Sequence, residues 1–148
     1  MNYPEFPRRH LPWVALALLL LAAAGCEEPR PEIVPVSGTV RIDGQPLTLG
    51  SVQVIPSGYR AAFGKIDENG RFSLTTYEPG DGCVLGTHQV AISACEVLNA
   101  GQQKWHAPKK YLDATRSGLT ATVDGPTDNL EINISWEGGK PFIERTGE

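Results

Sequence analysis

Apolar and polar residues alternate with a period of two in several short segments of the chain. Successive side chains on a β-strand point to opposite sides, so this alternation is typical of strands that bury one face. No window of helical length shows the 3.6-residue apolar stripe of an amphipathic helix. The pattern therefore predicts about seven strands. The alternating segments are 36–42, 52–54, 63–66 (the weakest), 72–74, 90–94, 119–123 and 130–136.

Turn signals separate these segments at Asp43-Gly44, Asp67–Gly70, Pro79–Gly82 and Asp124–Pro126. Asn, Asp and Gly tolerate the positive φ that tight hairpins need. Short strands with one apolar face cannot bury that face singly, and two sheets packed face to face solve the problem. The sequence therefore predicts an all-β fold, an immunoglobulin-like or transthyretin-like sandwich.

Residues 1–25 have the composition of an export signal. Arg8 and Arg9 precede Leu11–Ala24, a run without charges. That run is shorter than the roughly 20 apolar residues of a membrane-spanning helix. A basic start, an apolar middle and a small-residue end together predict a cleaved signal peptide.

The signal ends in Ala23-Ala24-Gly25-Cys26, which resembles the lipobox of bacterial lipoproteins. The resemblance implies that Cys26 carries a diacylglyceryl thioether and an acylated amine, which would anchor the chain to a membrane. The family usually has a large aliphatic residue where this chain has Ala23, which leaves open an ordinary signal peptide or an uncleaved anchor. Glu27 in place of Asp after the cysteine implies the outer membrane or cell surface, if the cell has an outer membrane.

The rest of the chain divides into three parts by composition. Residues 26–35 are rich in proline and predict an extended tether that reaches about 25 to 30 Å. Residues 36–136 hold the alternating segments and form the expected sandwich domain. Residues 137–148 are expected to be a C-terminal tail.

Charge and motifs exclude several classes of protein. The whole chain has a formal net charge of −4, and removal of the basic leader leaves the remainder more acidic. A nucleic-acid-binding protein would instead show a basic stripe. Nucleophile elbows, phosphate-binding glycine loops, zinc-type cysteine pairs and His-Glu-x-x-His motifs are absent from the sequence. We therefore expect neither catalysis nor a cofactor.

Five segments carry a family resemblance: Val36–Leu47, Asp67–Leu74, Glu78–Gly82, Gly86–Val90 and Pro108–Leu119. They look like the carboxypeptidase-regulatory-like, transthyretin-like module found in a group of short bacterial lipoproteins. In that family these motifs are turns and core positions, so the resemblance implies a fold and no particular ligand. The catalytic branch of the transthyretin-like fold ends in a Tyr-Arg-Gly-Ser type motif, which this chain lacks.

Residues 96–118 show no clear strand pattern, and loops of this length are usually functional or disordered. The segment carries excess positive charge in an acidic chain. One hypothesis is that its aromatic and basic side chains contact an anionic or sugar-rich envelope polymer; in the alternative, the aromatic rings cover the open end of the sandwich and the lysines are solvated. The candidate residues are Trp105, His106, Lys109, Lys110 and Tyr111.

Two cysteines and one histidine allow further predictions. Cys83 and Cys95 flank a predicted strand whose length, at about 3.3 Å per residue, exceeds the reach of a disulfide, so we expect both thiols to be unpaired. His88 has the parity of the inward apolar residues, which indicates a hydrogen-bonded structural histidine in preference to a metal ligand.

Two classes of function remain open. The first is a lipid-anchored, non-catalytic sandwich with a structural or interaction role in the envelope, with a membrane, an envelope protein or a polysaccharide as partner. The alternative is a lipoprotein that binds a small ligand or a metal and assists transport.

Overall fold

The computed structural model describes residues 31–145. The expected signal peptide, Cys26 and the first half of the expected tether therefore lie outside the described residues. Within the described part, no helix is long and apolar enough to span a bilayer.

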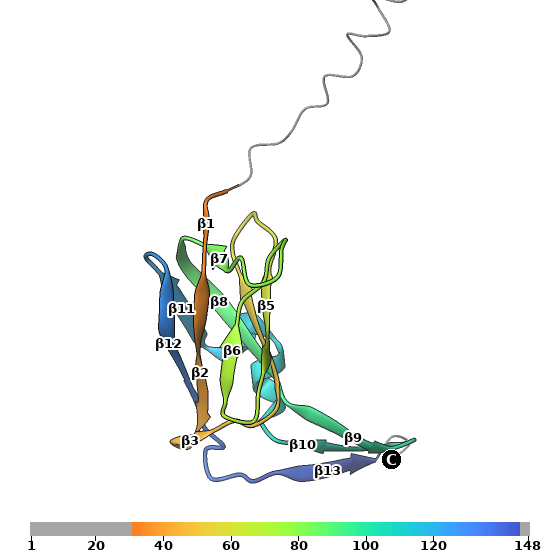
Figure 1. The fold of residues 1–148 in the computed structure, drawn as a ribbon. Coiled ribbons are helices and arrows are strands. Elements are labelled where there is room, and N and C mark those ends of the chain that lie inside the picture. Colours follow the sequence, from red (N-terminus) through yellow and green to blue (C-terminus); the bar gives the residue numbers. More distant parts are fainter. Residues whose placement is uncertain (1–30, 146–148) are drawn as a thin grey trace, which may run out of the picture. The chain divides into compact units, whose positions relative to one another are not determined.

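The first sheet of the domain contains four antiparallel strands in the order β11-β8-β4-β5 (Figure 1). Buried and less buried residues alternate in β4, β5 and β11, as the sequence pattern predicts, whereas β8 buries Val90, Ala91 and Ile92 in succession. In β5 the inward residues are Ala62, Gly64 and Ile66, while Phe63 faces solvent. The strands are β4 (Gly50–Ile55), β5 (Ala62–Ile66), β8 (Gly86–Ser93) and β11 (Leu119–Val123).

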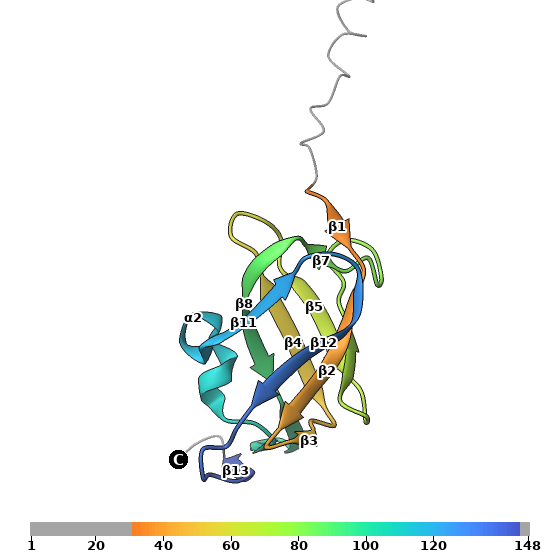
Figure 2. The same ribbon diagram turned by 90° about the vertical axis from the view of Figure 1, so that its left-hand side faces the viewer.

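The second sheet packs against the first, and Figure 2 shows β12 and β2 lying in front of β4, β5 and β8. Strand β2 pairs with β12 in parallel and with β3 and β6 antiparallel. A Cβ on Gly38 would stand 2.0 Å from the Leu130 carbonyl oxygen, so the close approach of β2 and β12 requires glycine there. The strands are β2 (Val36–Ile42), β3 (Gln45–Pro46), β6 (Arg71–Ser73) and β12 (Thr127–Ile134).

Inward side chains of both sheets form one apolar core, so the domain is an all-β sandwich. All seven predicted strands are confirmed, as β2, β4, β5, β6, β8, β11 and β12. The core residues with the lowest exposure are Val36, Val40, Val52, Val54, Ala62, Leu74, Cys83, Val90, Ile92, Ala94 and Val123.

Two of the predicted turns show the chemistry expected of them. Asp43 and Gly44 have φ values of 48° and 82° and join β2 to β3. Asp67 joins β5 to β6, and its carboxylate accepts hydrogen bonds from the backbone N–H groups of Asn69 and Arg71, both at 2.8 Å.

A short two-stranded sheet closes the end of the domain where the described chain begins. Strand β1 (Ile33–Val34) pairs with β7 (Cys83–Val84), and Val34 is buried. Gly82 has φ 98°, and a Cβ there would stand 1.7 Å from the Val34 carbonyl oxygen. The proline-rich segment, expected to be tether as far as residue 35, thus joins the domain at residue 33.

The prediction that residues 96–118 lack strands is wrong. They contain β9 (Cys95–Asn99), β10 (Gln102–Trp105), the 3-10 helix η1 (Lys109–Leu112) and α2 (Ala114–Ser117). The expected tail also contains a strand, β13 (Phe142–Arg145), which pairs with β10. The order β13-β10-β9 forms a fourth sheet among the described residues, which projects from the sandwich at the end away from β1 (Figure 1).

Candidate functional site

The candidate side chains of the sequence analysis lie where the projecting sheet meets the sandwich. Trp105 ends β10 and is 8% exposed. Its indole N–H donates to Oε2 of Glu144 at 2.9 Å, and the register places Trp105 opposite Phe142 on β13. The Trp105 ring is thus held by the last strand of the described chain.

Glu144 accepts hydrogen bonds from three side chains on this face of the sheet. Besides Trp105, these are the Gln103 amide at 3.1 Å and the Lys109 ammonium, which forms an ion pair with Oε1. The Lys109 hydrogen bond, followed by that of Trp105, lowers the pKa of Glu144. The thiol of Cys95 donates to the Gln103 amide oxygen at 3.2 Å. Glu144 therefore joins β13, β10 and η1.

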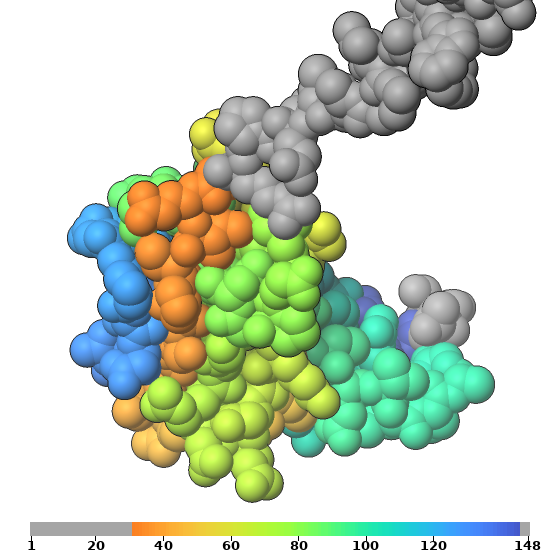
Figure 3. Space-filling model, turned by 45° about the horizontal axis from the view of Figure 1, so that its top comes forward, coloured from red at the N-terminus to blue at the C-terminus, as the bar shows by residue number. Residues whose placement is uncertain are grey.

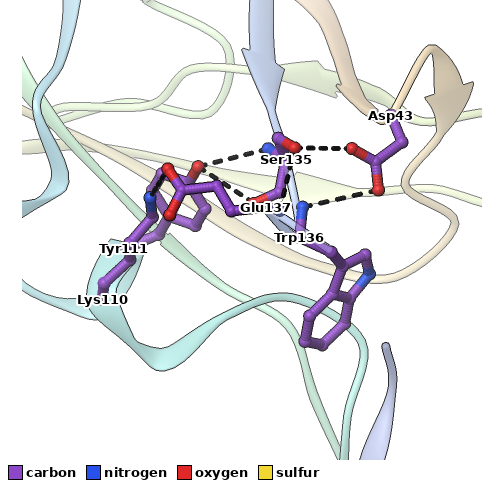
Figure 4. A network of polar contacts seen from close by, with 6 residues as sticks. All are labelled: Asp43, Lys110, Tyr111, Ser135, Trp136 and Glu137. Atoms are coloured by element: carbon purple, nitrogen blue, oxygen red, sulfur yellow. Dashed lines mark hydrogen bonds and ion pairs between the residues drawn. The ribbon is translucent and has the colours of Figure 1, made fainter. Parts of the chain in front are cut away.

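A second network lies at the lower end of β12 (Figure 4). Tyr111 is buried, and its hydroxyl donates to the Ser135 carbonyl and accepts from the Ser135 N–H, both at 3.2 Å. Lys110 forms an ion pair with Glu137, and this hydrogen bond raises the pKa of Lys110. Helix η1 is thus attached to the end of β12 by both of these side chains.

Asp43 extends this network to the β2–β3 turn (Figure 4). Its carboxylate accepts from the Ser135 hydroxyl at 2.7 Å and from the Trp136 N–H at 3.4 Å. The Glu137 N–H in turn donates to the Ser135 hydroxyl oxygen at 3.0 Å. Asp43 and Glu137 are also the two non-glycine residues with positive φ among those described, at 48° and 53°. The network therefore fixes two unusual backbone positions as well as side chains.

His106 lies apart from the Glu144 cluster, because alternate residues of a strand face opposite sides. Its Nε2 is 3.0 Å from Oε2 of Glu96 on β9. The pair therefore links the end of β10 to β9.

The structure thus brings all five candidate residues to one end of the domain and engages each of them within the chain. Trp105 and Tyr111 are buried, as the alternative to the ligand hypothesis predicts. The ammonium groups of Lys109 and Lys110 lie 4.9 Å and 4.8 Å from the centres of these two rings. A lysine of the same chain therefore already lies against each ring. The contacts of this cluster are made within the domain and hold its parts together.

Sequence reasoning did not find the acidic partners of this cluster, Glu137 and Glu144. Both lie in the segment that was expected to be a tail. The one available signal is the excess of positive charge in residues 96–118, which needs anionic partners elsewhere in an acidic chain. That signal predicts the sign of the partners' charge, but it does not predict their positions in the sequence.

The predictions on the remaining cysteines and on His88 are confirmed. Cys83 is a buried free thiol, and Cys95 is a partly exposed one. Burial raises the pKa of the Cys83 thiol. His88 is buried, and its Nε2 lies 2.7 Å from the Val84 carbonyl oxygen. Among the residues that the structure describes, no three His, Cys, Asp or Glu side chains lie close enough together to hold a metal ion.

The projecting sheet also carries exposed apolar side chains. Of the seven large hydrophobic residues exposed in the described chain, four belong to β9 and β13. They are Val97, Leu98, Phe142 and Ile143, and Val97 is 77% exposed. In Figure 3 the teal residues of the β9–β10 hairpin stand out from the body of the domain.

Comparison of the chain with protein-family models, with curated proteins and with solved structures finds no match.

Proposed function

We propose that this protein is an exported lipoprotein whose sandwich domain serves as a non-catalytic interaction module of the cell envelope. In this proposal Cys26 carries the lipid anchor, the proline-rich segment after it is a short tether, and the projecting sheet β13-β10-β9 is the contact surface. If the cell has an outer membrane, the residue after the cysteine favours the outer membrane or cell surface as the location.

The observation that carries the interaction role is the concentration of exposed apolar side chains on the projecting sheet. Isolated surface hydrophobics are common, but several of them on one small element of a soluble domain mark a candidate contact site. Four of the seven such residues among those described fall on this one small sheet. The sheet also has two edge strands, β9 and β13, whose outer backbone groups are available for pairing.

The position of the two ends of the domain supports the same proposal. The chain enters the domain through β1, and the projecting sheet lies at the opposite end (Figure 1). The eight residues of β8 alone span about 26 Å between these ends, at 3.3 Å per residue. In this proposal the lipid is therefore joined to the domain at the end opposite the projecting sheet.

Replacement of Cys26 by serine tests the anchor. We expect the unaltered chain to carry the mass of its acyl groups and to enter the detergent phase on partition, because several acyl chains on one residue bind a bilayer stably. We expect Cys26→Ser to lose both properties, whereas the control Cys95→Ser, at a partly exposed thiol, retains them. An unchanged acyl mass in Cys26→Ser would refute the proposed anchor.

A further inference from the structure

Strand β13 contributes almost nothing to the apolar core. None of its four residues is buried, and Phe142 and Ile143 are 40% and 56% exposed. The strands of the sandwich instead bury every second side chain. Because the hydrophobic effect scales with the area removed from water, detachment of β13 costs far less than detachment of a sandwich strand.

Side chains hold β13 and the turn before it mainly through polar contacts, to which the rings of Phe142 and Trp136 add an edge-to-face contact with centres 6.5 Å apart. The Lys109–Glu144 pair has side-chain exposures of 42% and 35%, and the Lys110–Glu137 pair has 38% and 69%. Ion pairs at such exposure contribute little to stability, because water screens them. The remaining side-chain bonds to β13 come from the Gln103 amide and the Trp105 indole. The segment 137–145 is thus fastened by bonds that can break without unfolding the sandwich.

A glycine-containing hinge precedes this segment. Residues 135–141 link β12 to β13 and include the pair Gly138-Gly139. Glu137 and Gly138 both have positive φ, at 53° and 86°, and the Gly139 N–H bonds to the Trp136 carbonyl at 2.9 Å. The chain therefore reverses direction in a tight turn that a small change of backbone angles would open.

Detachment of β13 uncovers a binding slot of defined chemistry. The edge of β10 then offers unpaired backbone groups, the Gln103 amide and the Trp105 N–H, while η1 offers the Lys109 ammonium. A β-strand fits this slot if it carries one carboxylate at the point where the Gln103 amide, the Trp105 N–H and the Lys109 ammonium converge, as Glu144 does. Strand β13 of another copy of the same chain meets this requirement by construction.

We propose that β13 is exchanged between two copies of this chain, so that the edge of β10 is a docking site for residues 142–145 of a second copy. The partner strand makes the same contacts in the exchanged dimer as in the closed monomer, so the exchange needs no new surface. This inference rests on the proposed function and names the partner of the projecting sheet. Anchoring to one bilayer would raise the local concentration of copies and favour the exchange.

Cross-linking between two differently tagged full-length chains tests this proposal. Lys104 and Ile143 face each other across β10 and β13, at a spacing that a disulfide can bridge. One chain carries Lys104→Cys and the other Ile143→Cys, both in a Cys95→Ser background, and the two are co-expressed and oxidised. The matched control pairs Lys104→Cys with Thr120→Cys, an exposed position on β11.

We expect a disulfide-linked heterodimer from the 104/143 pair and none from the control. A chain with both Lys104→Cys and Ile143→Cys should form the bond internally, which verifies that the geometry permits it. Internal bonding without any heterodimer would overturn the proposal, and so would equal heterodimer from the control. The readout works in the membrane or the soluble fraction, so a failure of the lipid anchor does not mimic a failure of the exchange.

The variant Glu144→Gln separates strand exchange from ordinary edge-to-edge contact. The Lys109–Glu144 pair is present in both the closed and the exchanged form, so its loss should accelerate exchange severalfold and leave the final dimer fraction unchanged. The control Glu131→Gln, at an exposed position of β12, should change neither quantity. A dimer fraction that falls in Glu144→Gln at an unchanged rate would instead indicate a contact between closed monomers and overturn the proposal.

Discussion

Asp81 provides a sharp test of how the domain end that contains β1 is stabilised. One carboxylate oxygen accepts from the Thr76 N–H at 2.7 Å, and the other accepts from the Tyr77 and Glu78 N–H groups, both at 2.9 Å. Burial by itself would raise the pKa of Asp81, but these backbone hydrogen bonds outweigh it and lower the pKa below its ordinary value. The loop they fix leads directly into Gly82 and β7.

The substitution Asp81→Asn preserves the shape of the side chain and replaces one of its two acceptor oxygens by an NH₂ group. The single amide oxygen can keep either the Thr76 bond or the bonds from Tyr77 and Glu78, and the NH₂ group then faces an N–H donor. Loss of at least one of these hydrogen bonds, and of the charge that strengthens the others, should cost about 2 kcal/mol. For a domain of this size that corresponds to a fall in Tm of about 10 °C.

The difference in stability between the wild type and Asp81→Asn depends on pH, which gives a second readout. A carboxylate with a lowered native pKa contributes stability above its unfolded pKa of about 3.9 and loses that contribution as the pH falls through the native value. The difference in Tm between the wild type and Asp81→Asn should therefore be largest near pH 7 and decrease below about pH 4. Thermal unfolding followed by circular dichroism measures it, with Asp124→Asn, an exposed carboxylate of the β11–β12 turn, as control. Equal Tm values at pH 7, or a gap that is constant down to pH 2.5, would refute this account.

Three further outcomes are expected. Gly38→Ala should prevent cooperative folding, because the added methyl would stand 2.0 Å from a carbonyl oxygen of β12. The control Gly125→Ala, with no atom within 4 Å of its Cβ, should melt like the wild type. An intact Gly38→Ala domain would show that β2 and β12 do not pair closely. Tyr111→Phe should lower stability by about 1 to 2 kcal/mol in urea titration, since it removes a buried hydroxyl with two backbone partners, and an unchanged midpoint would argue against that network. In the chain without Cys26, a thiol reagent should label Cys95 rapidly and Cys83 only on unfolding, as judged by mass; rapid double labelling would contradict the burial of Cys83.

The sandwich strands could be predicted from the sequence because each buries one face and exposes the other. Strands β9, β10 and β13 could not be predicted in this way, because the sheet they form projects from the core. Val97 and Leu98 are adjacent and both exposed, and the register shifts between Gln102 and Gln103, which removes the alternation. Strand β13 has four residues and finds its partner about 40 positions away, a pairing that no local pattern encodes.

The sequence around helix α2 contains capping residues at both ends of the helix. Asp113 caps it by accepting the Thr115 N–H at 2.9 Å, and Gly118 ends it with φ 70°. The helix has only four residues, too few to show a 3.6-residue period, so only its caps could have revealed it. The same holds for the candidate site. Its positive residues could be predicted from one segment of the sequence, but their acidic partners could not, because the tertiary fold determines which residues pair.

The parallel pairing of β2 and β12 has a mechanical consequence. The chain enters β2 from the β1 end and leaves β12 towards the projecting sheet. A pull on the start of β2 against a load held by β13 therefore acts along the two strands in shear. In that geometry their inter-strand bonds share the tension and must rupture together instead of one after another, so the domain can transmit force from one end to the other.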